Sequence, residues 1–113
     1  MATFSDLQSI AGAFPHVEES TSYNTPAFKI HKRLIARLRE DGYSMAMRAT
    51  EEDRMALPTL TPDIYSIPAH YVGSEMLVID LHKADRDELQ RMFAKAVALT
   101  EHDAQRAKSR RRR

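Results

Sequence analysis

Residues 23–48 read YNTPAFKIHKRLIARLREDGYSMAMR, and apolar and polar side chains alternate along most of this stretch. Phe28 and Ile30 fall on one side and Lys29 and His31 on the other, which is the period of two expected of a half-buried strand. The Asp-Gly dipeptide within the stretch is typical of a two-residue hairpin turn, because both central positions favour positive φ. We therefore expect three short antiparallel strands whose apolar side is covered by helices.

The other side of these strands is crowded with cations. Burying an unpaired Lys or Arg is costly, so we expect this set to face water on one shared surface. Such a surface would neutralise phosphates, and each contact would add about one unit to the salt dependence of duplex binding. The alternative is an ordinary charged surface, in which the cations pair with Glu40, Asp41 and neighbouring acids. The alternating basic residues are Lys29, Arg33, Arg37, Arg39 and Arg48.

The formal net charge of +1 hides a segregation of charge along the chain. Residues 27–48 carry a net charge of +4 and residues 106–113 carry +6, whereas residues 1–26 carry −3 and residues 49–105 carry −6. The near-neutral total argues against a nucleic-acid-binding protein of the histone type. The uneven distribution is compatible with a local binding patch.

The composition is that of one small domain. A chain of 113 residues can bury roughly 65% of its unfolded surface without a metal or a disulfide. There is no Cys, which excludes a disulfide framework, a thiolate nucleophile and a Cys-based zinc site, and is compatible with a reducing cytoplasm. The N-terminus lacks the pattern of a secretory signal, and the longest strongly apolar run, residues 76–79, is far short of the ~20 residues of a membrane span. We expect a soluble, cytoplasmic protein with no membrane partner.

The rest of the chain supplies helices and further strands. Capping residues followed three positions later by an acid predict helix starts at Thr3, Thr50 and Asp85. Pro15 and Pro58 are expected to end the first two helices. Strands are expected at 18–23, 63–67 and 76–81. The second of these should be short or at an edge, because the proline at position 68 cannot donate to a ladder.

This order of elements, α-β-β-β-β-α-β-β-α, predicts an α+β domain. We expect a mainly antiparallel sheet of about five to six strands with three helices, in a two-layer sandwich. The single domain is placed at residues 1–105. Residues 106–113 carry six cations and no large apolar side chain, so we expect a disordered basic tail there.

Several motifs, in this order along the chain, resemble those of the MmcQ/YjbR-like family. They are PHVEES at 15–20, TPAFKI at 25–30, LIARL at 34–38 with Asp41-Gly42, IPAHYVG at 67–73, and LVIDL at 77–81 before the Asp-capped helix. Asn24 and Lys32 depart from the family pattern, which has Gly there, and the aromatic residue that often follows the PHY-type segment is missing around 74–76. The resemblance, which covers roughly residues 3–100, implies a small α/β sandwich of bacterial cytoplasmic type that binds DNA, with no established catalytic activity.

Motifs for catalysis are not found in the sequence. The five histidines never approach the i, i+4 spacing of a helical metal pair, and three glycines are too few for most phosphate-binding loops. No nucleophile elbow and no Ser-His-Asp order at a recognisable spacing occurs. The adjacent acids Glu18 and Glu19 are more typical of a solvated face than of an acid–base pair. We therefore expect a protein that is not an enzyme and that uses no cofactor or metal.

His70 and Tyr71 form the best candidate for a functional point, because they lie in a Pro-flanked loop that a rigid sheet would hold in place. The alternative is that Tyr71 packs on the rim of the sheet while His70 bonds to the loop backbone. Tyr43 is expected to point toward the core, which leaves Tyr23 or Tyr65 as candidates for stacking on bases. Base-specific readout therefore has little support.

Two functions remain open at this point. One is a nonspecific DNA-binding or nucleic-acid-binding module that uses the basic sheet face and the Arg-rich tail. The other is a small protein-interaction or adaptor domain with no nucleic-acid role, which grips an acidic protein partner or a like subunit through the sheet face or an exposed edge. The residues assigned to nucleic-acid binding are Lys29, Lys32, Arg33, Arg37, Arg39, Arg48, His70 and Tyr71.

Overall fold

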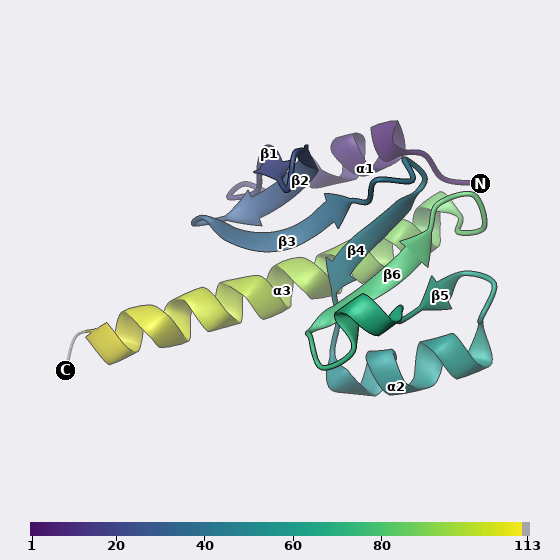
Figure 1. Cartoon of the computed structure of the whole chain (residues 1–113). Coiled ribbons are helices and arrows are strands. Elements are labelled where there is room, and N and C mark those ends of the chain that lie inside the picture. Colours follow the sequence, from purple (N-terminus) through teal and green to yellow (C-terminus); the bar gives the residue numbers. More distant parts are fainter. Residues whose placement is uncertain (112–113) are drawn as a thin grey trace.

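The computed structural model describes the backbone of residues 1–111 and the side chains of residues 1–107. In this part of the chain an antiparallel six-stranded sheet carries three helices (Figure 1), which confirms the predicted α+β class and order of elements. The helices are α1 (Phe4–Ala11), α2 (Glu51–Leu60) and α3 (Arg86–Arg111), with a short 3-10 helix, η1 (Ala69–Tyr71). The strands are β1 (Glu18–Ser22), β2 (Thr25–Ile30), β3 (Arg33–Leu38), β4 (Ser44–Arg48), β5 (Tyr65–Ser66) and β6 (Met76–Asp80).

The strands follow the order β1-β2-β3-β4-β6-β5, so β1 and β5 form the two edges of the sheet. The first four strands are joined as successive hairpins, and β6 then pairs with β4. β5 contains only two residues and lies at an edge, as the proline that follows it predicts.

One face of the sheet is covered by α1 and α3, and the core lies between them and the strands. Phe93 of α3 is fully buried there. Its ring meets those of Phe14 and Phe28 edge-on, at centroid distances of 5.5 and 5.7 Å. Because each aromatic ring removes a large apolar area from water, this cluster fixes the position of α3 on the sheet.

The predicted helix starts are confirmed by their caps. Thr3 and Asp6 form a reciprocal pair: each side chain accepts a hydrogen bond of 3.0 Å from the backbone N–H of the other. The Thr50 hydroxyl accepts from the N–H of Asp53 at 3.1 Å. The carboxylate of Asp85 accepts from the N–H of residue 88 at 2.8 Å. Each cap satisfies a backbone donor that the first turn of a helix leaves unpaired.

Two helices run further than the sequence predicts. Pro58 lies inside α2 and does not end it, because in the last turn it removes one donor while Thr61 N–H still bonds to the carbonyl of Leu57 at 2.8 Å. α3 continues to Arg111, so residues 106–111 are helical and differ from the disordered tail that was expected; the boundary at residue 105 falls inside this helix. Ala, Gln, Arg and Lys are strong helix formers, and cations at a helix C-terminus oppose the helix dipole. Residues 112 and 113 of the predicted tail lie outside the described part of the chain.

A β-bulge interrupts the pairing of β2 with β3. Phe28 lies opposite Ala36, but the next residue of β2 lies opposite Leu34, so Ile35 is an extra residue in β3. Ile35 and Ala36 are both fully buried in the core although they are consecutive. The alternation of side chains therefore shifts by one residue at Ile35. Arg33 and Arg37, which a regular strand would place on the same side of the sheet, face opposite sides.

Two hairpin turns place residues other than Gly in the left-handed region. Tyr23 and Asn24 join β1 to β2 with φ of 53° and 66°, and His31 and Lys32 join β2 to β3 with φ of 48° and 68°. This is the type I′ geometry, which suits the twist of a hairpin and which Asn and Gly adopt most readily. Residues with larger side chains accept a cost of roughly 1–2 kcal/mol there. Tyr23, His31 and Lys32 are therefore strained relative to the usual turn residues.

Replacing Phe93 by Ala should lower the free energy of unfolding by about 3–5 kcal/mol, because the change leaves a cavity at the centre of the core. Met55→Ala is the matched control, since Met55 lies on α2 with 72% of its surface exposed. Urea unfolding followed by circular dichroism measures both changes. Equal and small effects of the two substitutions would contradict the placement of α3 over the sheet.

Candidate functional site

Arg37 lies inside a hydrogen-bonded cluster on the face of the sheet opposite α3. It pairs across the sheet with Ala27 and Ala46, and only 7% of its surface is exposed. One terminal nitrogen donates to Thr25 Oγ1 at 3.0 Å, to Glu40 Oε1 at 3.2 Å and to the Leu38 carbonyl at 3.3 Å. The guanidinium group is therefore used within the fold.

The segment around η1 packs onto this cluster. The other terminal nitrogen of Arg37 donates to the Tyr71 hydroxyl at 3.2 Å, and the Arg39 guanidinium lies 5.7 Å from the centre of the Tyr71 ring. His70 packs edge-on against the same ring at 5.2 Å and is itself exposed. On the outer side, the Tyr23 ring lies 5.3 Å from the Arg37 guanidinium. We call this group the Arg37 cluster; its residues are Tyr23, Thr25, Arg37, Arg39, Glu40, His70 and Tyr71.

The charge of the Arg37 cluster is compensated in part: Glu40 pairs with Arg37 at 3.2 Å, and Asp41, outside the cluster, lies 4.0 Å from Arg39. Burial by itself would lower the pKa of Arg37, but its hydrogen bonds to Glu40 and Tyr71 outweigh burial and raise the pKa above its ordinary value. The pKa of Glu40 is lowered by a hydrogen bond from its own backbone and by Arg37. Near Arg39, burial would raise the pKa of Asp41, yet bonds from Ser44 and from the backbone N–H of Tyr43 lower it. Arg37 is therefore a fixed internal cation.

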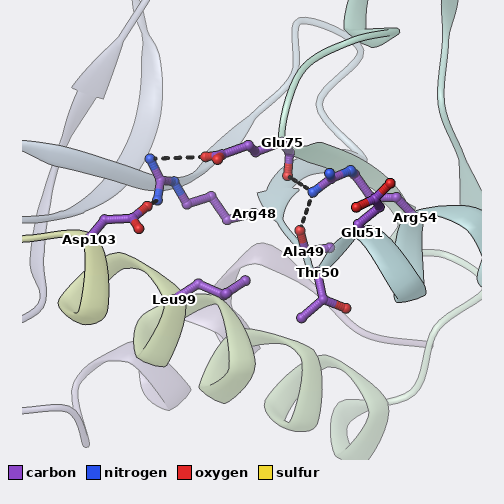
Figure 2. Close-up of a pocket in the computed structure, with 8 residues that line it drawn as sticks. All are labelled: Arg48, Ala49, Thr50, Glu51, Arg54, Glu75, Leu99 and Asp103. Carbon is purple, nitrogen blue, oxygen red and sulfur yellow. Dashed lines mark hydrogen bonds and ion pairs between the residues drawn. The ribbon is translucent and has the colours of Figure 1, made fainter. Parts of the chain in front are cut away.

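Arg48 is also held by neighbouring acids. It lies between Glu75, at 3.4 Å, and Asp103 of α3, to which it donates a short hydrogen bond (Figure 2). Beside it Arg54 donates to the carbonyls of Ala49 and Glu75. The hydrogen bond from Arg48 is the main cause that lowers the pKa of Asp103. These residues surround a cavity of about 160 Å³ in which the charge of Arg48 is opposed by Glu75 and Asp103.

A different set of cations lies around the β2–β3 turn, at one end of the sheet. Because Arg33 precedes the bulge and lies opposite Ile30, it faces the α3 side of the sheet. It lines a cavity of about 220 Å³ together with Asp103, Arg106 and Ala107 of α3.

A second cavity, of about 250 Å³, connects the same turn to α3. It is lined by His16, His31, Glu101, Ala104 and Gln105. The turn residue Lys32 therefore lies close to the C-terminal half of α3, and Figure 1 shows this helix continuing past the sheet on that side. We call this region the basic end; its cationic residues are Lys32, Arg33 and Arg106, with Lys108, Arg110 and Arg111 at the last helical positions of α3.

The cations of the basic end form no ion pair among the described side chains, although Asp103 lines the same cavity as Arg33 and Arg106. Within residues 1–107, Lys32, Arg33 and Arg106 form no ion pair, whereas Arg37, Arg39 and Arg48 each do. Lys32 and Arg106 are exposed and Arg33 is half-buried. Lys29, Arg54, Lys83 and Arg91 likewise form no ion pair in the described part of the chain, so the basic end is distinguished by the proximity of Arg33 to Arg106.

The prediction of one shared basic face is wrong. Of the eight residues assigned to nucleic-acid binding, Arg37, Arg39, His70 and Tyr71 come together in the Arg37 cluster. Arg48 lies elsewhere, between two acids, and Lys32 and Arg33 lie at the basic end. Lys29 is half-buried on the outer face, opposite Glu18 of β1. The bulge at Ile35 is the physical reason for the displacement of Arg33, which it places on the α3 side of the sheet.

Two aromatic residues also differ from expectation. Tyr43 does not point into the core; 41% of it is exposed, and its ring stacks on His82 at 4.9 Å. Tyr65 is buried and its hydroxyl donates to Glu88, so it offers no face to a ligand. Burial and this bond raise the pKa of Tyr65. Of the two stacking candidates only Tyr23, which is 81% exposed, is open to solvent.

Comparisons with known proteins support the fold. No family model and no curated protein matches the chain. The crystal structure of Deinococcus radiodurans protein DR2400, described with a DUF419 domain, superposes with a TM-score of 0.75 at 19% identity, over 88% of this chain and 78% of that one. At this level of identity the likeness shows a shared fold.

Two further observations limit the kind of site. Among the described residues no group of three or more His, Cys, Asp or Glu side chains is placed to hold a metal ion. In the same part of the chain, no helix is both long enough and apolar enough to cross a bilayer.

Arg37→Leu should lower the free energy of unfolding by about 2–4 kcal/mol, because it leaves the polar groups of Thr25 and Tyr71 without their partner. The control is Arg91→Leu, an exposed position on α3 where the change should stay within about 0.5 kcal/mol. Chemical unfolding curves of the two variants give the comparison. A cost for Arg37→Leu no larger than that of the control would show that the guanidinium is not part of the folded framework.

Proposed function

We propose that this protein is a YjbR-like protein that binds DNA or other nucleic acid without sequence specificity, through its basic end. The observation that carries the proposal is that Arg33 and Arg106 line one cavity without forming ion pairs, with the exposed Lys32 next to Arg33 in the β2–β3 turn. The resemblance of the sequence motifs and the shared fold with a DUF419 protein, which belongs to the same family type, agree with it.

The basic end has the physical properties that phosphate binding needs. Exposed cations near a polyanion displace condensed counterions, and this release supplies most of the free energy of nonspecific binding. A cation that is already paired with a carboxylate gives less, because the internal pair must be broken first. For that reason the proposal moves the contact surface from the sheet face to the end of α3 and the β2–β3 turn.

The geometry favours binding without base readout. The exposed cations Lys32 and Arg106 are available to phosphates at this end of the molecule. The proposal assigns Arg33 and Arg106 to phosphates, and contacts to phosphates carry no sequence information. The proposed role is binding alone, without a catalysed reaction and without a cofactor.

Binding of a labelled duplex, measured by fluorescence anisotropy over a range of salt concentrations, tests this proposal. The parent should bind in the micromolar range at low salt. Lys32→Ala combined with Arg106→Ala should reduce the slope of log K against log salt by about two units, since each phosphate contact contributes about 0.9. The matched control, Lys83→Ala with Arg91→Ala, removes two exposed cations elsewhere and should leave the slope unchanged.

Equal slopes for the parent and the Lys32/Arg106 variant would exclude the basic end as the contact surface. A loss seen only when the chain is truncated after Gln105 would also contradict the role of the β2–β3 turn. Absence of duplex binding, together with salt-dependent capture of an acidic protein, would favour the alternative of a protein-interaction domain.

A further inference from the structure

Tyr23 occupies a position that the fold does not require to be aromatic. It is the first residue of the β1–β2 turn, with φ of 53°, and 81% of its surface is exposed. Asn, Asp and Gly fill such a position with less strain, and a bulky residue there is uncommon. An exposed ring contributes little to the core, so the contact with Arg37 and the open face of the ring are what distinguish an aromatic residue at this place.

The ring of Tyr23 is held in place from one side. Its centre lies 5.3 Å from the guanidinium of Arg37, within the range of a cation–π contact. Arg37 is in turn fixed by bonds to Thr25, Glu40 and Tyr71, so the ring rests on an immobile support. With one face on this support and most of the residue exposed, the opposite face is open to solvent.

Such a ring is pre-organised for stacking. A free aromatic side chain loses rotational freedom when a ligand stacks on it, whereas the Tyr23 ring is already ordered by Arg37. The ligands that match an open, flat aromatic face on a polar protein surface are planar and aromatic themselves. An unpaired nucleobase fits this description, and stacking tolerates any base because each has a π-face.

The position of Tyr23 relative to other cations agrees with a single strand. β2 runs from the Tyr23 turn to the His31–Lys32 turn, and its six residues span roughly 20 Å. Lys29 lies on the same outer face as Arg37, between the two turns. A strand laid along β2 would place phosphates near Lys29 and Lys32 and a base on Tyr23.

We propose that Tyr23 is a stacking platform for an unpaired base, and that the protein therefore binds single-stranded nucleic acid through the outer face along β2 in addition to phosphates at the basic end. The inference rests on the proposed nucleic-acid function. It adds a distinction between substrates, because the bases of an intact duplex are stacked on one another and cannot present a free face to the ring.

The test compares Tyr23→Asn with Tyr23→Phe, using a labelled oligothymidylate of roughly 15 nucleotides and a labelled duplex of the same length. Asn adopts positive φ readily, so Tyr23→Asn should fold with a Tm at or above that of the parent. It should bind oligothymidylate roughly tenfold more weakly, the loss expected for removal of a stacking ring, and should bind the duplex as the parent does. Tyr23→Phe keeps the ring and should bind both probes like the parent.

Unchanged oligothymidylate binding by Tyr23→Asn, with duplex binding intact, would overturn the stacking platform and leave the proposed function standing. An equal loss for both probes would overturn it as well, because the contact would then be independent of base stacking. A Tm of Tyr23→Asn well below that of the parent would show that the ring serves to cover Arg37. Failure of the parent to bind either probe would overturn the proposed function itself.

Discussion

The structure depends on one constraint in β3, which is that two consecutive residues, Ile35 and Ala36, are both buried in the core. A regular strand cannot point neighbouring side chains the same way, so the strand accommodates them with a bulge. The bulge separates Arg33 from Arg37 and sends them to opposite faces of the sheet. The different surroundings of Arg33 and Arg37 follow from this separation.

The separation divides the cations into two kinds. Arg37 and Arg39, which follow the bulge, and Arg48 of the next strand form ion pairs with acids. Arg37 also donates to Tyr71 and so holds the η1 segment on the sheet. The cations before the bulge, with Arg106, have no ion pair among the described side chains and lie where α3 leaves the sheet. Positive charge therefore stabilises the fold around Arg37 and Arg48, whereas at the basic end it is available to a polyanion.

Local features of this fold could be read from the sequence, and features that depend on tertiary contacts could not. The caps at Thr3, Thr50 and Asp85, and the strands, follow from short-range propensity and alternation. Arg37 and Tyr71 are separated by 34 positions in the sequence, and Arg48 and Asp103 by 55 positions. No local pattern in the sequence predicts these contacts. The helical backbone of residues 106–111 was not predicted from the sequence, although Ala, Lys and Arg favour the helix.

The separation of the arginines is tested most directly by NMR of the guanidinium groups in isotope-labelled protein. Hydrogen bonds to four partners should restrict rotation of the Arg37 group, which then gives separate, slowly exchanging Nη–H signals. Arg33 and Arg106, without ion pairs, should give averaged signals that exchange rapidly with water. Rapid exchange at Arg37, equal to that at Arg33, would contradict the account.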